Sequence, residues 1–171
     1  MAGKQQTVTL HGKPVTIVGT PVKVGNPVPD FSVVDQDLNT VTRSVLAGSP
    51  CILSSVVSLD TPVCDIQMRR FNSEAASLGK NVRILVVSMD LPFAQKRWCG
   101  AAGATNVKAL SDHRDASFGK AFGVLIRDLR LLARAVFLVD ARGVLRYCEV
   151  VPEVTHEPDY QAVLKALREL P

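Results

Sequence analysis

Cys64 is the residue whose surroundings in the sequence are best suited to chemistry. It follows Thr61 and Pro62, a pair typical of the N-cap and first position of a helix. Backbone N–H groups in the first turn of a helix are unpaired, and that end carries roughly half a positive charge, so both effects favour a thiolate. The pattern therefore indicates a nucleophilic cysteine. Cys64 also falls on the apolar face of the helix, which is typical of a small core residue.

Two further residues are candidates for the same chemistry. Cys99 lies in the next predicted helix beside Lys96 and Arg97, whose charges either stabilise a thiolate or form a solvated face. Arg134 opens a predicted strand in an apolar run, where an unpaired charge is costly. It is therefore either a surface-facing strand end or an active-site cation.

The other cysteines and the histidines give weaker signals. Cys51 and Cys148 lie inside apolar strand patterns, and we expect both to be structural. No two cysteines have CxxC spacing, and His11, His113 and His156 are distant from them in sequence, so we expect no zinc site. A Cys–His pairing of the protease type stays open, but no feature supports it. The phosphate-binding patterns GxxxxGK and GxGxxG do not occur.

Short periodic runs predict the elements that must position these residues. Strands are expected at Thr7–Leu10 and Pro14–Val18, which form a hairpin, and then at Phe31–Asp35, Cys51–Val57, Val82–Ser88, Ala109–Leu110, Ala135–Asp140 and Val144–Val150. Helices are expected at Thr61–Leu78 with Gly79 as C-cap, from Asp90 to about Ala102, at Ala116–Phe122 and at Pro158–Leu170.

This order of elements predicts an α/β fold. The strand–helix–strand unit from Cys51 to Ser88 should be a right-handed crossover between parallel strands. A hairpin with its turn at Ala141–Gly143 then joins the same sheet, so we expect a central mixed sheet with helices on both faces. Sites in such sheets lie beyond the carboxyl ends of the parallel strands, which is where the loop Ser58–Pro62 falls.

Composition excludes several classes of protein. The 171 residues suit a single domain over 1–171, and 47% hydrophobic against 21% charged residues exclude a disordered chain. The net charge of +4 is scattered and only 5% of residues are aromatic, which argues against nucleic-acid binding. With no apolar run long enough for a membrane helix and no signal core, we expect a cytoplasmic protein. Thiols stay reduced there, so any disulfide should be transient and catalytic.

Four segments together resemble one family. SLDTPVCD (Ser58–Asp65), DLPFAQKRWCG (Asp90–Gly100), LLARAV (Leu131–Val136) and EPDY (Glu157–Tyr160) are similar to segments of bacterial thiol peroxidases, the atypical two-cysteine peroxiredoxins. The likeness covers almost the whole chain, including the N-terminal hairpin. It implies a thioredoxin fold, which agrees with the order of elements above.

The resemblance also implies roles for individual residues. Cys64 would be the peroxidatic cysteine and Cys99 the resolving cysteine, joined in an intrachain disulfide. Thr61 would give its hydroxyl to the thiolate and the peroxide, and Arg134 would be the family arginine that supports both. The implied substrates are hydrogen peroxide and organic hydroperoxides, the reductant is thioredoxin, and the assembly is a homodimer. No metal or organic cofactor is needed, because sulfur carries the electrons.

The chain departs from the family motif at one position. The family has proline four residues before the threonine, and this chain has Val57 there. We expect the substitution to lower the rate rather than change the reaction. Two alternatives remain: a thiol–disulfide oxidoreductase, against which the missing CxxC argues, and a binding or redox-sensing protein inactivated by the change at Val57.

Overall fold

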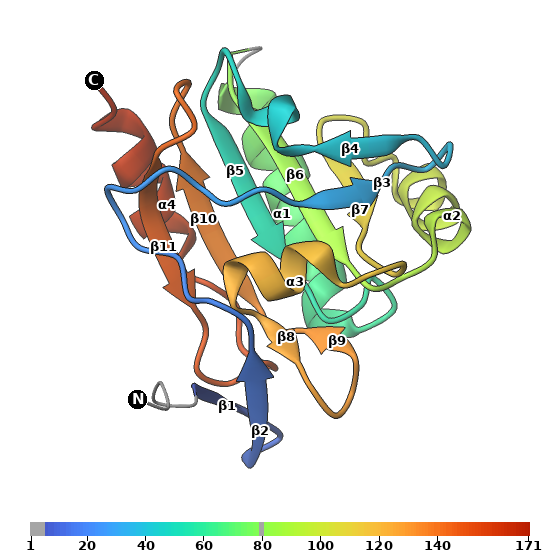
Figure 1. The fold of residues 1–171 in the computed structure, drawn as a ribbon. Coiled ribbons are helices and arrows are strands. Elements are labelled where there is room, and N and C mark those ends of the chain that lie inside the picture. The colour runs from blue at the N-terminus through green and yellow to red at the C-terminus, as the bar shows by residue number, and fades with distance from the viewer. Residues whose placement is uncertain (1–5, 79–80) are drawn as a thin grey trace.

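The computed structural model describes residues 6–78 and 81–171, and among these residues seven strands form one mixed sheet (Figure 1). In spatial order they are β11 (Leu145–Val150), β10 (Ala135–Val139), β5 (Cys51–Ser55), β6 (Arg83–Ser88), β7 (Lys108–Ser111), β3 (Ser32–Val34) and β4 (Thr40–Thr42). Strands β5, β6 and β7 are parallel, and every other neighbouring pair is antiparallel. The predicted mixed α/β sheet is therefore confirmed.

The helix that carries Cys64 begins where the sequence predicts. Helix α1 (Pro62–Leu78) follows β5 and leads to β6, which pairs in parallel with β5. Helix α2 (Pro92–Ala102) likewise leads from β6 to β7, and it ends at Gly103 with a left-handed φ of 63°. Each crossover moves one strand further along the sheet in the same direction, from β5 to β6 and from β6 to β7. Because such crossovers are right-handed, α1 and α2 lie on the same face of the sheet.

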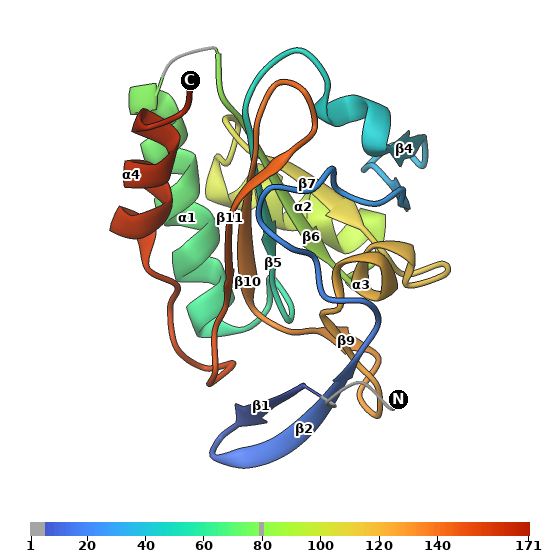
Figure 2. The same cartoon turned by 60° about the vertical axis from the view of Figure 1, so that its left-hand side comes forward.

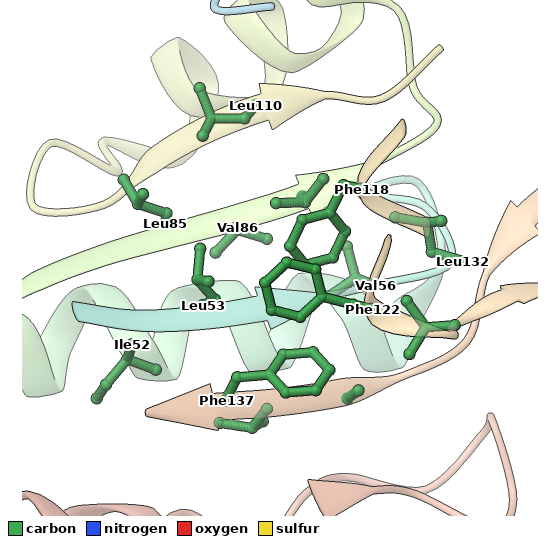
Figure 3. Packing of buried hydrophobic residues seen from close by; sticks show 14 of the residues in the cluster. Ile52, Leu53, Val56, Leu85, Val86, Leu110, Phe118, Phe122, Leu132 and Phe137 are labelled. Carbon is green, nitrogen blue, oxygen red and sulfur yellow. The ribbon is translucent and has the colours of Figure 1, made fainter. Parts of the chain in front are cut away.

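Helices cover both faces of the sheet, as predicted. Helices α1 and α4 (Tyr160–Arg168) lie against one face, and α3 (Ser117–Phe122) lies against the other (Figures 1 and 2). Phe118 and Phe122 of α3 stack with ring centroids 4.3 Å apart, and Phe122 meets Phe137 of β10 edge-on at 5.0 Å (Figure 3). This aromatic packing fixes α3 to the sheet from the side opposite Cys64.

The N-terminal hairpin is confirmed, but it does not join the central sheet. Strands β1 (Thr7–Leu10) and β2 (Lys13–Val18) pair instead with β8 (Leu125–Ile126) and β9 (Leu131–Leu132) in a second sheet. In Figure 1 this hairpin lies at the lower end of the molecule, where α1 begins. It is therefore close to the expected site.

Several predicted boundaries were wrong by one or more residues. β5 ends at Ser55 rather than Val57, because the chain leaves the sheet after the Val56 N–H donates to the Val87 carbonyl. α3 begins after Ala116, whose φ of 50° is left-handed and not helical. α4 begins after Asp159, whose carboxylate caps it by accepting from the Ala162 N–H. Strands β2, β3, β6, β7, β10 and β11 also begin or end one residue away from their predicted limits. Helix α2 begins two residues after Asp90, and α4 ends two residues before Leu170.

Four short elements were not predicted: β4, β8, β9 and the 3-10 helix η1 (Arg43–Leu46). None is longer than four residues, which is too short to show a hydrophobic period. The predicted C-cap at Gly79 lies outside the described residues. Within those residues, no helix combines the length and apolar character needed to cross a membrane.

Candidate active site

Cys64 lies in the first turn of α1 and is fully buried. Nη2 of Arg134 donates a hydrogen bond to its sulfur over 3.1 Å. Arg134 directly precedes β10, and because β10 is antiparallel to β5, it comes to lie beside the loop that leads to Cys64. Only 1% of Arg134 is exposed, so this arginine is not a surface-facing strand end. The structure therefore brings Arg134 and Cys64, two of the predicted site residues, into direct contact.

Three protein groups hold the Arg134 guanidinium in place. Its Nε donates to the Val154 carbonyl over 2.9 Å, and Nη1 donates to Oε1 of Gln67. The Gln67 amide nitrogen in turn donates to the Ser54 hydroxyl over 2.5 Å. Gln67 and Ser54 are fully buried. The cation is therefore oriented before any substrate binds, with Cys64 as its third partner.

Gln67 belongs to the candidate site, and the sequence analysis missed it. It lies three residues after Cys64, so the two side chains share one face of α1. A polar residue on that otherwise apolar face is unusual, because a buried amide must be hydrogen-bonded. A glutamine on the apolar face of the helix was therefore the sequence signal that could have pointed to this residue.

Thr61 lies at the pocket beside Cys64, but its hydroxyl is engaged within its own loop. The hydroxyl donates to the Ser58 carbonyl over 3.0 Å. Asp90 holds the same loop from the neighbouring strand end, because its carboxylate accepts from the Ser58 hydroxyl over 2.7 Å and from the Leu59 N–H over 2.9 Å. The loop before Cys64 is thus tied to the residue that leads into α2.

A pocket of about 280 Å³ adjoins this site. Its lining is mostly apolar and comprises Leu10, His11, Val57, Thr61, Pro62, Val63, Arg134, Val154 and Thr155. The tip of the N-terminal hairpin forms one wall of the pocket. Glu153 fastens that tip by accepting hydrogen bonds from the Thr9 hydroxyl and from the His11 and Gly12 N–H groups. Bonds from Thr9 and Thr155 hold the pKa of the Glu153 carboxyl well below its usual range.

Cys99 lies in different surroundings. It is on α2 with 9% of its surface exposed, and its sulfur accepts a hydrogen bond from the Gln36 side-chain amide over 3.4 Å. Burial raises the pKa of the Cys99 thiol. The neighbouring Lys96 does not contact this thiol and instead pairs with Asp37 at 2.9 Å. Cys64 and Cys99 are both free thiols, so no disulfide joins them in this structure.

Within the described residues, the sulfurs of the remaining two cysteines accept no hydrogen bond from a cation. Cys51 is fully buried in β5, and burial raises the pKa of its thiol to about 12. Cys148 is half-buried in β11, and burial likewise raises its pKa. In the described part of the chain, no three His, Cys, Asp or Glu side chains gather to hold a metal ion.

The fold and this site define a thioredoxin-like redox protein. The family model described as Redoxin matches residues 23–164. The chain is 51% identical over 163 residues to the thiol peroxidase of Bacillus subtilis (strain 168), covering 95% of this chain and 97% of that protein. It is 49% identical over 163 residues to the thiol peroxidase of Staphylococcus aureus (strain MRSA252), with 95% and 98% covered. The chain belongs to the redoxin family, among the thiol peroxidases, which are peroxiredoxin-type enzymes.

Solved structures agree with this assignment. The crystal structure of a peroxiredoxin-like protein from Aquifex aeolicus superposes with a TM-score of 0.87 at 42% identity, covering 98% of this chain and 99% of that chain. A thiol peroxidase from Chromobacterium violaceum, at 23% identity and a TM-score of 0.87, shares the fold over 97% of both chains. The relatives support a thiol-dependent peroxidase function.

Proposed function

We propose that this protein reduces hydrogen peroxide and organic hydroperoxides with Cys64 as the attacking thiolate. The observation that carries the proposal is the 3.1 Å hydrogen bond from Arg134 to the Cys64 sulfur, in a buried helix start beside a pocket. A cation and the unpaired N–H groups of a helix start both favour the thiolate, which is the reactive form of cysteine.

In the first step, the Cys64 thiolate attacks the terminal oxygen of a hydroperoxide. An S–O bond forms and the O–O bond breaks, so two electrons pass from sulfur to the peroxide. The departing oxygen takes up the proton that the thiol released, giving an alcohol or, from hydrogen peroxide, water. Arg134 stabilises the charge that develops on the departing oxygen. The Thr61 hydroxyl orients the peroxide once it turns from the Ser58 carbonyl.

In the second step, Cys99 resolves the sulfenic acid on Cys64. The Cys99 sulfur attacks the Cys64 sulfur, the S–O bond breaks, and water leaves with the thiol proton. An intrachain disulfide results, and the dithiol of thioredoxin reduces it by exchange. Sulfur carries all the electrons, so the cycle needs no metal or organic cofactor.

The proposal extends to the setting of the enzyme. In the described part of the chain, buried apolar side chains gather in one cluster, which supports a single domain over 1–171. Four free cysteines suit a reducing cytoplasm. We further propose a homodimer, to which the family likeness points.

Peroxide consumption by the purified protein with thioredoxin, thioredoxin reductase and NADPH tests this proposal. The wild type should consume hydrogen peroxide and cumene hydroperoxide, whereas Cys64→Ser should abolish turnover. Cys51→Ser is the matched control and should keep the activity, because Cys51 pairs with Val139, at the end of β10 opposite to Arg134. Full activity of Cys64→Ser would rule out the assignment, and an inactive wild type would favour a binding or sensing role.

Peptide mapping after one equivalent of peroxide tests the resolving step. The expected product is an intrachain link between Cys64 and Cys99. Links only between chains, or links to Cys51 or Cys148, would assign the resolving role elsewhere.

A further inference from the structure

A second set of contacts joins the two helices that carry Cys64 and Cys99. Asp65 directly follows Cys64 in α1, and Trp98 directly precedes Cys99 in α2. The indole Nε1 of Trp98 donates to Oδ1 of Asp65 over 2.8 Å, and Nε of Arg69 donates to Oδ2 over 2.9 Å. The Arg69 guanidinium also lies over the Trp98 ring, 5.4 Å from its centroid. We refer to Asp65, Arg69 and Trp98 as the interhelix cluster.

The geometry of the helices shows why this cluster opposes the disulfide. Packed helix axes lie about 8–10 Å apart, whereas a disulfide needs Cα atoms within about 7 Å of each other. Successive side chains of a helix point about 100° apart. While Asp65 and Trp98 face each other, Cys64 faces Arg134 and Cys99 faces Gln36. The first turn of α1 or the last turns of α2 must unwind before the sulfurs meet.

We propose that the interhelix cluster is a latch that holds the peroxide-reactive form closed and limits the rate of disulfide formation. The inference rests on the proposed function and adds a positioning role for Asp65, Arg69 and Trp98. With the latch open, the Cys64 sulfenic acid and the Cys99 thiol give a disulfide and water. With it closed, a second hydroperoxide oxidises the sulfenic acid to sulfinic acid and leaves as the alcohol.

The exposure of the cluster shows which of its contacts contributes most to holding the latch closed. The side chains of Asp65 and Arg69 are 32% and 53% exposed, so solvent screens this ion pair and it adds little by itself. The bond from the Trp98 N–H reaches the same carboxylate in a part-buried setting, so solvent screens it less than the exposed ion pair, which makes it the stronger contact. Removing that N–H should therefore release the latch.

The test separates the two chemical steps. Trp98→Phe removes the N–H donor and keeps an aromatic ring beneath Arg69. Rapid quenching at successive times, dimedone to trap sulfenic acid, N-ethylmaleimide to block thiols and mass analysis give the rate of each step. Disulfide formation should become about three- to tenfold faster, while oxidation of Cys64 stays within about twofold of wild type. Less sulfinic acid should form at high peroxide concentration.

Control variants make the outcome decisive. Arg97→Gln changes an exposed neighbour of Trp98 on α2, and it should leave the disulfide rate unchanged. Asp65→Asn keeps an acceptor for Trp98 but loses the charge that attracts Arg69, so a smaller acceleration is expected. If circular dichroism shows that Trp98→Phe is unfolded, Asp65→Asn serves as the test variant in its place. A disulfide rate that is unchanged or slower would overturn the latch and leave the proposed function intact. Failure of Cys64 to form sulfenic acid in the wild type would instead overturn the proposed function.

Discussion

Cys64 and Cys99 are both buried cysteines on helices that follow parallel strands, yet their surroundings differ. The Cys64 sulfur receives a hydrogen bond from the Arg134 guanidinium over 3.1 Å. The Cys99 sulfur receives one from an uncharged amide, Gln36, over 3.4 Å, and burial raises its pKa. A helix and burial are common to both, so they do not by themselves make a nucleophile. The difference is a fully charged partner that directly precedes a distant strand. Under the proposed function, this partner suits Cys64 to attack peroxide, whereas Cys99 stays protonated until it resolves the sulfenic acid.

Removal of the Arg134 guanidinium should have the largest effect on the difference in reactivity between Cys64 and Cys99. Arg134→Ala should slow the reaction of Cys64 with peroxide on the order of 100-fold, the typical loss for one electrostatic donor. Stopped-flow oxidation under second-order conditions measures the rate, and circular dichroism checks that the chain remains folded. Wild-type kinetics in a folded Arg134→Ala variant would show that charge does not distinguish the two thiols.

Loss of the residue that orients the cation should have a smaller effect. Gln67→Leu keeps the approximate volume but removes the acceptor for Nη1 of Arg134, so the guanidinium is held less tightly, and a loss of roughly tenfold is expected. Ser54→Ala is the matched control. It removes only the hydrogen bond between Gln67 and Ser54, which does not touch Arg134, so it should slow the reaction less than Gln67→Leu. If Ser54→Ala slowed the reaction more than Gln67→Leu, the orientation argument would fail.

The protonation of Cys99 gives a pH-dependent test of the same contrast. Because its pKa is raised in the folded state, its thiolate fraction near pH 8 lies below that of an ordinary cysteine. The folded state therefore favours the protonated thiol. The contribution of Cys99 to the free energy of unfolding falls once the pH rises above the ordinary cysteine pKa of about 8.5, because the unfolded chain then gains the thiolate more easily. Alkylation of Cys99 by iodoacetamide, followed by peptide mapping, should be several-fold slower than for a free cysteine peptide at pH 8. It should still rise beyond pH 9, and a plateau below pH 8 would contradict the prediction.

The smallest effect is expected at Val57. Its N–H donates no hydrogen bond to any described residue, so proline would remove no such bond there. Val57 is 8% exposed and lines the pocket, and proline would restrict the loop before Thr61. Val57→Pro should raise the rate of Cys64 oxidation about two- to threefold by lowering the entropy cost of ordering the loop. Stopped-flow fluorescence of Trp98 measures it, and an equal or slower rate would show that the surroundings are adapted to valine.

Features encoded by neighbouring residues were predictable from the sequence. Both helix starts, at Thr61-Pro62 and at Leu91-Pro92, follow from a proline whose fixed φ suits the first helical position. The parallel pairing of β5 and β6 follows from the handedness of the crossover. By contrast, β8 and β9 are two-residue strands that depend on distant partners: β8 pairs with the edge of β2, and β9 pairs in turn with β8. No local pattern indicates those edges.

The position of Cys64 in the first turn of a helix was determined by the sequence alone, because Thr61 and Pro62 act on the backbone within the same few residues. Only the tertiary structure decided what faces its sulfur. Arg134 is 70 residues away in sequence, and it reaches Cys64 because β10 pairs antiparallel with β5. Gln67 and the Val154 carbonyl then complete its hydrogen bonds, as a buried charge requires. Such contacts depend on strand order and packing, which residues adjacent in sequence do not specify.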